Sequence, residues 1–130
     1  MHHLYDFEGL VLEAARVLKA GGIYYCDHDM DSGFGRRFGL ALSCYRKLRN
    51  PRAKYAKMNE AITPQVYELA EWQEKGIDSA QVIALFREEG FSVQSRYHWY
   101  GLSRVTDALF GQKQYSRGWA PLFLMVAVKK

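Results

Sequence analysis

The segment Asp27–Asp31 reads Asp-His-Asp-Met-Asp and follows an apolar stretch that predicts a buried strand. A carboxylate or an imidazole at the end of such a strand can take a proton from a substrate hydroxyl or amine, so His28 and Asp29 are the candidate catalytic residues. Asp27 and Asp31, at the two ends of the segment, are candidates to face the substrate. The alternative is a structural strand end in which an acidic side chain caps the following helix.

The same segment has part of the spacing of a calcium-binding loop, because Asp27, Asp29 and Asp31 stand at alternate positions. Such a loop needs a glycine where this sequence has Ser32, and a bidentate glutamate where it has Phe38. Histidines elsewhere could add ligands for a transition metal, but their spacing is not diagnostic. We therefore assign no metal ligand.

Positive charge is concentrated in one segment. Between Ser32 and Asn59 there are eight basic residues and no acid, whereas the rest of the chain has ten bases and fourteen acids. One interpretation is a solvated face, or a lid in which Arg36, Arg37 and Tyr45 face an anionic substrate. The alternative is a non-enzymatic basic interaction module that binds nucleic acid or an acidic partner through residues 36–57.

Apolar patterning predicts the elements that position these residues. We expect strands at Ile23–Asp27, Phe91–Trp99 and Leu122–Val128, of which the first and last lack polar alternation and should be buried on both faces. The second alternates with period two, so Phe91, Val93, Tyr97 and Trp99 share one face. The aromatic set Tyr97, Trp99, Tyr100 and Trp119 is expected to belong to the hairpin core rather than to a ligand cage.

Helices are expected between these strands. Asp6 is the predicted N-cap of a first helix that stops at Gly21, and Asp78 is the predicted N-cap of a helix that stops at Gly90. Further helices are expected over the basic segment, from Pro64 to Gly76, and from Ser103 to Phe110.

Composition places the chain among globular proteins. Its 130 residues make one domain, and 48% hydrophobic residues are ample for a packed core. No apolar run reaches the length of a membrane span. The two cysteines suggest reduced thiols, so we expect a cytoplasmic protein without membrane partners.

Three consecutive features resemble class I S-adenosylmethionine-dependent methyltransferases. They are His-His-Leu-x-Asp at the start, a helix ending Ala-Arg-Val-Leu-Lys-x-Gly-Gly, and a strand ending in acidic residues. Residues 1–33 and 78–130 carry the likeness, and residues 34–77 form a basic helical insert where that family covers its substrate. The resemblance implies an α/β fold with a partial Rossmann-like sheet of about three mixed strands. It ends in an antiparallel hairpin, the last strand lies between the other two, and helices cover the faces.

The resemblance also implies a cofactor, S-adenosylmethionine, with His2 and His3 at the rim of its site, and a small-molecule substrate. The family's glycine-rich loop and its ribose-binding acid have no counterpart here. We therefore expect the C-terminal part of a methyltransferase, inactive alone and binding the cofactor weakly or not at all. The strand at Ile23–Asp27 should be an exposed edge that forms a homodimer or docks a missing N-terminal portion.

Overall fold

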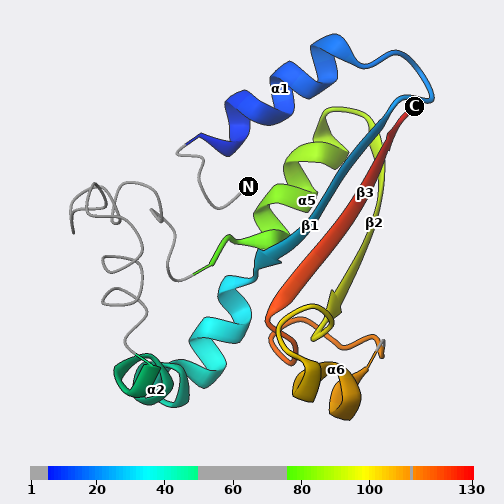
Figure 1. The fold of residues 1–130 in the computed structure, drawn as a ribbon. Helices are drawn as coiled ribbons and strands as arrows, with labels where there is room; N and C mark the ends of the chain where they lie inside the picture. The colour runs from blue at the N-terminus through cyan, green and yellow to red at the C-terminus, as the bar shows by residue number, and fades with distance from the viewer. Residues whose placement is uncertain (1–5, 50–75, 112) are drawn as a thin grey trace, which may run out of the picture.

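The computed structural model describes residues 6–49, 76–111 and 113–130 (Figure 1). In chain order, the elements are α1 (Phe7–Val17), β1 (Ile23–Met30), α2 (Ser32–Arg49), α5 (Ser79–Glu88), β2 (Phe91–His98), α6 (Arg104–Phe110) and β3 (Leu122–Lys129). The fold class is therefore α/β, as the sequence predicts. The expected helix from Pro64, and the residues His2 and His3, lie outside the described residues.

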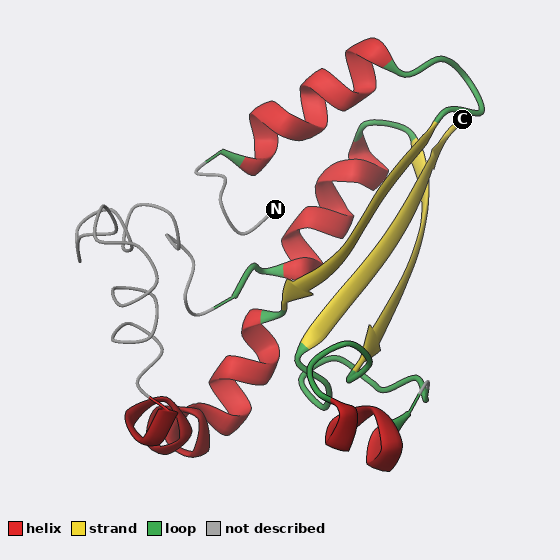
Figure 2. Ribbon diagram, viewed as in Figure 1, coloured by secondary structure: helices red, strands yellow, loops and turns green. Residues whose placement is uncertain are grey.

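The described strands form one open sheet in the order β1-β3-β2 (Figure 2). The predicted central position of the last strand is confirmed. The expectation of a mixed sheet is wrong, because β3 pairs antiparallel with both neighbours, from Ile23 opposite Val128 on one side to Phe91 opposite Lys129 on the other. β1 and β2 do run parallel to each other, but they are separated by β3 and share no hydrogen bonds.

Helices α1 and α5 lie on the same face of the sheet (Figure 1). Their apolar side chains meet alternate residues of β3 in one core. The fully buried members are Val11, Ile77, Val82, Phe86, Phe91, Phe123, Met125 and Ala127. Burying the apolar faces of two helices and a sheet against each other is the main source of stability in such a layer.

The opposite face of the sheet is open within the described residues. There Ile23 and Tyr25 are 60% and 59% exposed, and Leu124 and Val126 of β3 are only partly buried. Within the described residues, burial on both faces is therefore not observed: β1 is exposed on this face, and β3 is fully buried only on the helix-covered face. The physical reason is that both sheet-packing helices among the described elements cover one side.

The predicted helix ends are largely confirmed. The Asp6 carboxylate accepts a hydrogen bond from the Gly9 N–H, and Asp78 accepts from the N–H groups of Ala80 and Gln81. Gly21 has φ +78°, but it lies beyond the turn that ends α1, whose C-cap is Leu18. In the described part of the chain, no helix has both the length and the apolar character that a membrane span needs.

β1 lies at an edge of the sheet. Its carboxyl end is covered by Ile77, which bridges Asp31 in parallel, with the Ile77 N–H donating to Met30 and the Ser32 N–H donating to Ile77. From Ile23 to Asp29, β1 has only β3 as a strand partner among the described residues. The predicted edge position is thus confirmed, while what pairs with it remains a proposal.

Candidate functional site

The acidic end of β1 is split between two faces of the sheet by a β-bulge. Cys26 pairs with Met125 and Asp29 pairs with Phe123, so two residues, Asp27 and His28, stand opposite one on β3. His28 occupies the left-handed region with φ +62°, which is uncommon for a residue with a Cβ. The bulge leaves Asp27 and His28 more exposed than the neighbours that precede and follow them, Cys26 and Asp29, which are buried.

Asp27 is the centre of what we name the outer cluster: Tyr25, Asp27, His28 and His98. Its Oδ1 lies 2.9 Å from Nε2 of His98 and accepts from the His28 backbone N–H at 2.7 Å. Its Oδ2 accepts from the Tyr25 hydroxyl at 3.0 Å and lies 3.2 Å from Nδ1 of His28. One carboxylate therefore contacts two imidazole rings, which meet edge to face with their centroids 5.5 Å apart.

These contacts set the charge state of the carboxylate. Partial burial raises the pKa of Asp27, but the hydrogen bonds from His98, the His28 N–H and Tyr25 outweigh it and hold that pKa below its usual value. The same bond to Asp27 raises the pKa of the Tyr25 hydroxyl. Asp27 is thus an acceptor at neutral pH, and a carboxylate that orients an imidazole is an arrangement suited to general-base chemistry.

The two imidazoles differ in their surroundings. His98 is largely buried, and its Nδ1 has no hydrogen-bond partner in the described structure. The His28 side chain is half exposed, yet a Cβ at Gly101 would overlap its Nε2, so this ring packs closely under the Gly101 turn. His28 is therefore the more accessible candidate for proton transfer.

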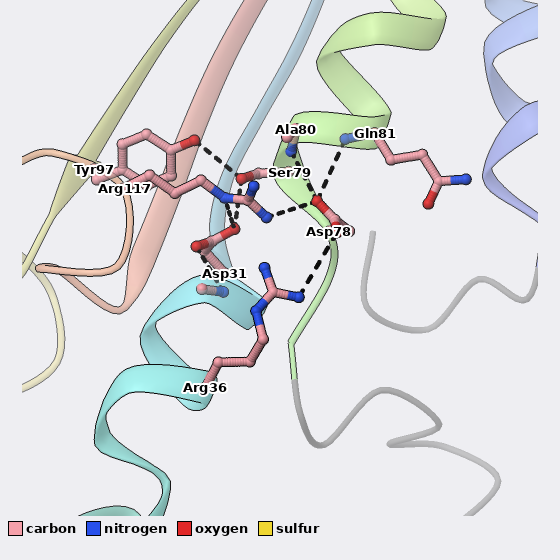
Figure 3. Close-up of polar contacts among 9 residues, drawn as sticks. Asp31, Arg36, Asp78, Ser79, Ala80, Gln81, Tyr97 and Arg117 are labelled. Carbon is pink, nitrogen blue, oxygen red and sulfur yellow. Dashed lines mark hydrogen bonds and ion pairs between the residues drawn. The ribbon is translucent and has the colours of Figure 1, made fainter.

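A second group, the inner cluster, lies on the helix-covered side (Figure 3). It consists of Asp31, Asp78, Ser79, Tyr97 and Arg117. Asp31 and Ser79 are both fully buried. The Ser79 hydroxyl lies 2.5 Å from Asp31 Oδ1 and 3.0 Å from the Tyr97 hydroxyl. Since the single serine proton goes to the carboxylate, Tyr97 must donate to Ser79.

Arg117 neutralises two carboxylates of the inner cluster. Its Nε donates to Asp31 at 3.2 Å, and its terminal nitrogen donates to Asp78 at 2.6 Å. Partial burial raises the pKa of Asp78, but the helix N–H of Gln81 and the charge of Arg117 outweigh it, so that pKa lies below its usual value. The other Asp31 oxygen accepts from the Gly33 N–H at 2.9 Å. The inner cluster therefore ties three segments, the end of β1, the start of α5 and the loop before β3.

Next to the inner cluster, α2 and the connection between β2 and β3 enclose an open pocket of about 490 Å³. Its walls are mainly aromatic rings, those of Phe38, Trp99, Phe110, Tyr115 and Trp119. Trp99 stacks on Phe110 at 5.0 Å, and its indole N–H donates to the Trp119 carbonyl. Helix α2 kinks at Phe38, which has glycines on either side at 35 and 39, and this brings the Phe38 ring to 6.2 Å from Trp119.

The structure separates the residues that the sequence singled out. His28 and Asp27 meet in the outer cluster, while Asp29 lies buried on the opposite face with Cys26. Asp31 belongs to the inner cluster, and Arg36 lies 3.8 Å from Asp78 at its border.

The remaining predicted site residues lie either beside the pocket or outside what the structure describes. Arg37 stacks on Trp119, 4.0 Å from the ring centroid, beside the pocket. The Tyr45 side chain, like His2 and His3, lies outside what the structure describes. The aromatic set also divides, because Tyr97 packs on Phe123 in the core whereas Trp99 and Trp119 line the pocket.

Sequence reasoning missed His98 and the pair Ser79 and Arg117. Each stands far from its carboxylate partner in the sequence, and none belongs to a motif. His98 reaches Asp27 across the central strand β3, and this contact depends on how the strands pair rather than on any local pattern.

Within the described residues, no three histidine, cysteine, aspartate or glutamate side chains are grouped to hold a metal ion. Comparison with known protein families, with curated proteins and with solved structures finds no match for this chain. The fold, the two clusters and the pocket are therefore the features from which a function can be inferred.

Proposed function

We propose that this chain forms the C-terminal, substrate-side part of a class I S-adenosylmethionine-dependent methyltransferase. The observation that carries the proposal is the strand order β1-β3-β2, with the last strand antiparallel between the other two. The central place of β3 and its antiparallel pairing with β2 are what the resemblance implies, and they follow a helix, a Gly-Gly turn and an acidic strand end in the order expected.

The position of the polar groups supports the same proposal. The carboxyl ends of β1 and β2 meet at one end of the sheet, beside α2 and α6 (Figure 1). In α/β sheets ligands bind outside the carboxyl ends of the parallel strands. Both clusters and the aromatic pocket gather at this end, so a substrate there would meet the pocket from one side and His28 from the open face.

The described residues do not fit the cofactor. The only Gly-x-Gly of the sequence is Gly33-Phe-Gly35, and a Cβ at Gly33 would lie 2.5 Å from Asp31 Oδ2. That glycine therefore makes room for a carboxylate of the same chain rather than for a bound ligand. In the proposed enzyme, the cofactor site is supplied by a segment that pairs along the free edge of β1.

The chain's own contribution is then on the acceptor side. The pocket would hold the substrate, and the inner cluster would keep the loop that carries Trp119 fixed to the sheet. His28, oriented by Asp27, could take the proton that an acceptor hydroxyl or amine loses. Methyl transfer from a sulfonium depends mostly on in-line positioning, so this base is an aid rather than a requirement.

A chimera tests the proposal. The N-terminal half of a known small-molecule methyltransferase, through its fourth strand, would be joined to residues 2–130, and S-adenosylmethionine binding would be measured by calorimetry. We expect the chimera to bind the cofactor, and the isolated N-terminal half and the isolated 130-residue chain to bind it weakly or not at all.

Two outcomes would contradict the proposal. One is a chimera that binds no better than the N-terminal half alone, while that half rejoined to its own C-terminal part does bind. The other is micromolar binding of S-adenosylmethionine to the isolated chain, because the described residues lack a site for it.

A further inference from the structure

We propose that the aromatic pocket between α2 and the β2–β3 connection binds a small planar aromatic anion. The inference that such a molecule binds stands on the pocket itself. In the proposed enzyme this molecule would be the methyl acceptor, and that identification alone rests on the proposed function.

The walls of the pocket favour a flat, unsaturated ligand. Five aromatic side chains contribute to them, and Trp119 remains 51% exposed although it stands in the wall. Large aromatic rings left partly exposed around a concave surface are typical of ligand-binding sites. A volume of about 490 Å³ suits a small molecule rather than a peptide or a helix.

The rings are also held in place before any ligand arrives. The Trp99 N–H is fixed on the Trp119 carbonyl, and Phe34, which is buried, packs on both Phe38 and Trp99 at about 5 Å. Arg117, two residues before Trp119, is anchored to two carboxylates. A preformed pocket loses little conformational entropy when a rigid ligand enters it.

No charged side chain of the described residues lines the pocket itself, but the segments around it are basic. The two segments that build the pocket, residues 32–41 and 99–119, carry one acid and five bases. The bases are Arg36, Arg37, Arg104, Lys113 and Arg117. The one acid, Asp107, accepts a hydrogen bond from the Gly101 N–H.

Arg37 does not line the pocket, but it lies against one of its walls, and we therefore assign it the contact with the charged group of the ligand. Its guanidinium lies on the Trp119 indole, 4.0 Å from the ring centroid, and has no carboxylate partner among the described residues. By contrast, Arg117 is already paired with Asp31 and Asp78. A guanidinium held flat on an indole keeps its edge N–H groups free for a carboxylate or a phosphate. Gln114 and Ser116 add neutral polar groups to the wall.

The test uses the full chain and three probes of similar size. They are 2-naphthoate, its neutral analogue 2-naphthamide, and decahydro-2-naphthoate, which keeps the charge and the two-ring frame without the aromatic rings. Binding is measured by calorimetry, and the indole N–H signals of Trp99 and Trp119 are followed by NMR. We expect 2-naphthoate to bind most tightly and to shift both indole signals.

Two variants separate the charge from the ring. Arg37→Met keeps the packing on Trp119 but removes the charge, and it should weaken 2-naphthoate about tenfold without affecting 2-naphthamide. Trp119→Ala should weaken both aromatic probes. The matched control is Arg96→Met, which removes the same charge from an exposed position on β2 and should change neither affinity.

Three results would overturn the inference: equal affinity for the naphthoate and the naphthamide, equal effects of the two arginine variants, or no binding of 2-naphthoate at millimolar concentration. None of these depends on S-adenosylmethionine. Failure here therefore leaves the chimera test intact, and failure of the chimera leaves this binding measurement valid.

Discussion

The inner and outer clusters each contain an aspartate from the end of β1 or just after it, but the two carboxylates have opposite surroundings. Asp31 is fully buried and its two oxygens accept from Ser79, Arg117 and the Gly33 N–H. Asp27, four residues earlier, remains partly exposed between two imidazoles. The inner cluster joins three segments of the chain, whereas the outer cluster contains a strained backbone at His28 and a buried unpaired nitrogen in His98.

The difference shows how the covering layer decides the role of a carboxylate. A charge that helices enclose must be fully paired, and it then serves to hold the structure. A charge on the open face can keep strained and unpaired neighbours, which are found more often at functional sites than elsewhere. Two aspartates of one short segment therefore have different roles: Asp31 holds the structure together, and Asp27 is a candidate for chemistry.

Removal of the Asp31 carboxylate is the strongest way to test this comparison. Asp31→Ala leaves the buried Ser79 hydroxyl and part of the Arg117 charge unpaired, so we expect a loss of about 3 kcal/mol in the free energy of unfolding. Asp27→Ala is the matched variant in the outer cluster and should lose about 1 kcal/mol, because two of its three partners, Tyr25 and His28, reach water. Urea unfolding measures both, and equal losses would show that the two clusters do not differ in this way.

The backbone at His28 gives a smaller effect. With φ at +62°, a glycine at this position avoids the strain that any Cβ introduces. His28→Gly should therefore be more stable than His28→Ala by about 1 kcal/mol, since both variants lose the imidazole and differ only in the Cβ. If thermal or urea unfolding ranks alanine equal to glycine, the left-handed conformation is not maintained in solution.

The smallest expected effect is the change in the free energy of unfolding as the pH is lowered, to which Asp27 of the outer cluster contributes. The pKa of Asp27 in the folded chain lies below its unfolded value of about 3.9, so unfolded chains take up the proton first. The stability that Asp27 contributes is therefore complete above about pH 5 and is lost as the pH falls through the folded-state pKa.

Unfolding midpoints in urea from pH 5 to pH 2 should accordingly fall less steeply for Asp27→Asn than for the parent chain. Part of the slope should survive, because the pKa of Asp78 is lowered as well. Parallel curves for the two proteins would mean that the contacts with His98 and Tyr25 do not stabilise the ionised form.

Much of the fold could be predicted because it depends on local patterns. Period-two alternation located β2, and the caps at Asp6 and Asp78 located two helix starts. The central place of β3 followed from the resemblance. The antiparallel hairpin of β2 and β3 also followed from the resemblance and is confirmed. The antiparallel pairing of β3 with β1 and the open face were not predicted, since they depend on how the strands and helices pack rather than on the composition of any strand.

The candidate site was predicted only in part, for a related reason. The acidic segment was found because its residues are adjacent, but the bulge that turns Asp27 and His28 away from Asp29 has no sequence signal such as a glycine at His28. The partners Ser79, His98 and Arg117 come from other elements. Their contribution depends on the register of paired strands and on loop geometry, which one sequence does not reveal.

The central place of β3 has a consequence for how the chain acquires its structure. Ile23 pairs with Val128, so β1 has no strand partner among the described residues until the segment from Leu122 onward has been synthesised. During translation β1 therefore has no described strand to pair with on either edge while nearly all the remaining described elements are made. Contacts so distant in sequence fold slowly and leave strands open to aggregation. We infer that yield in a cell will depend on chaperones or on a partner strand that pairs with β1 early.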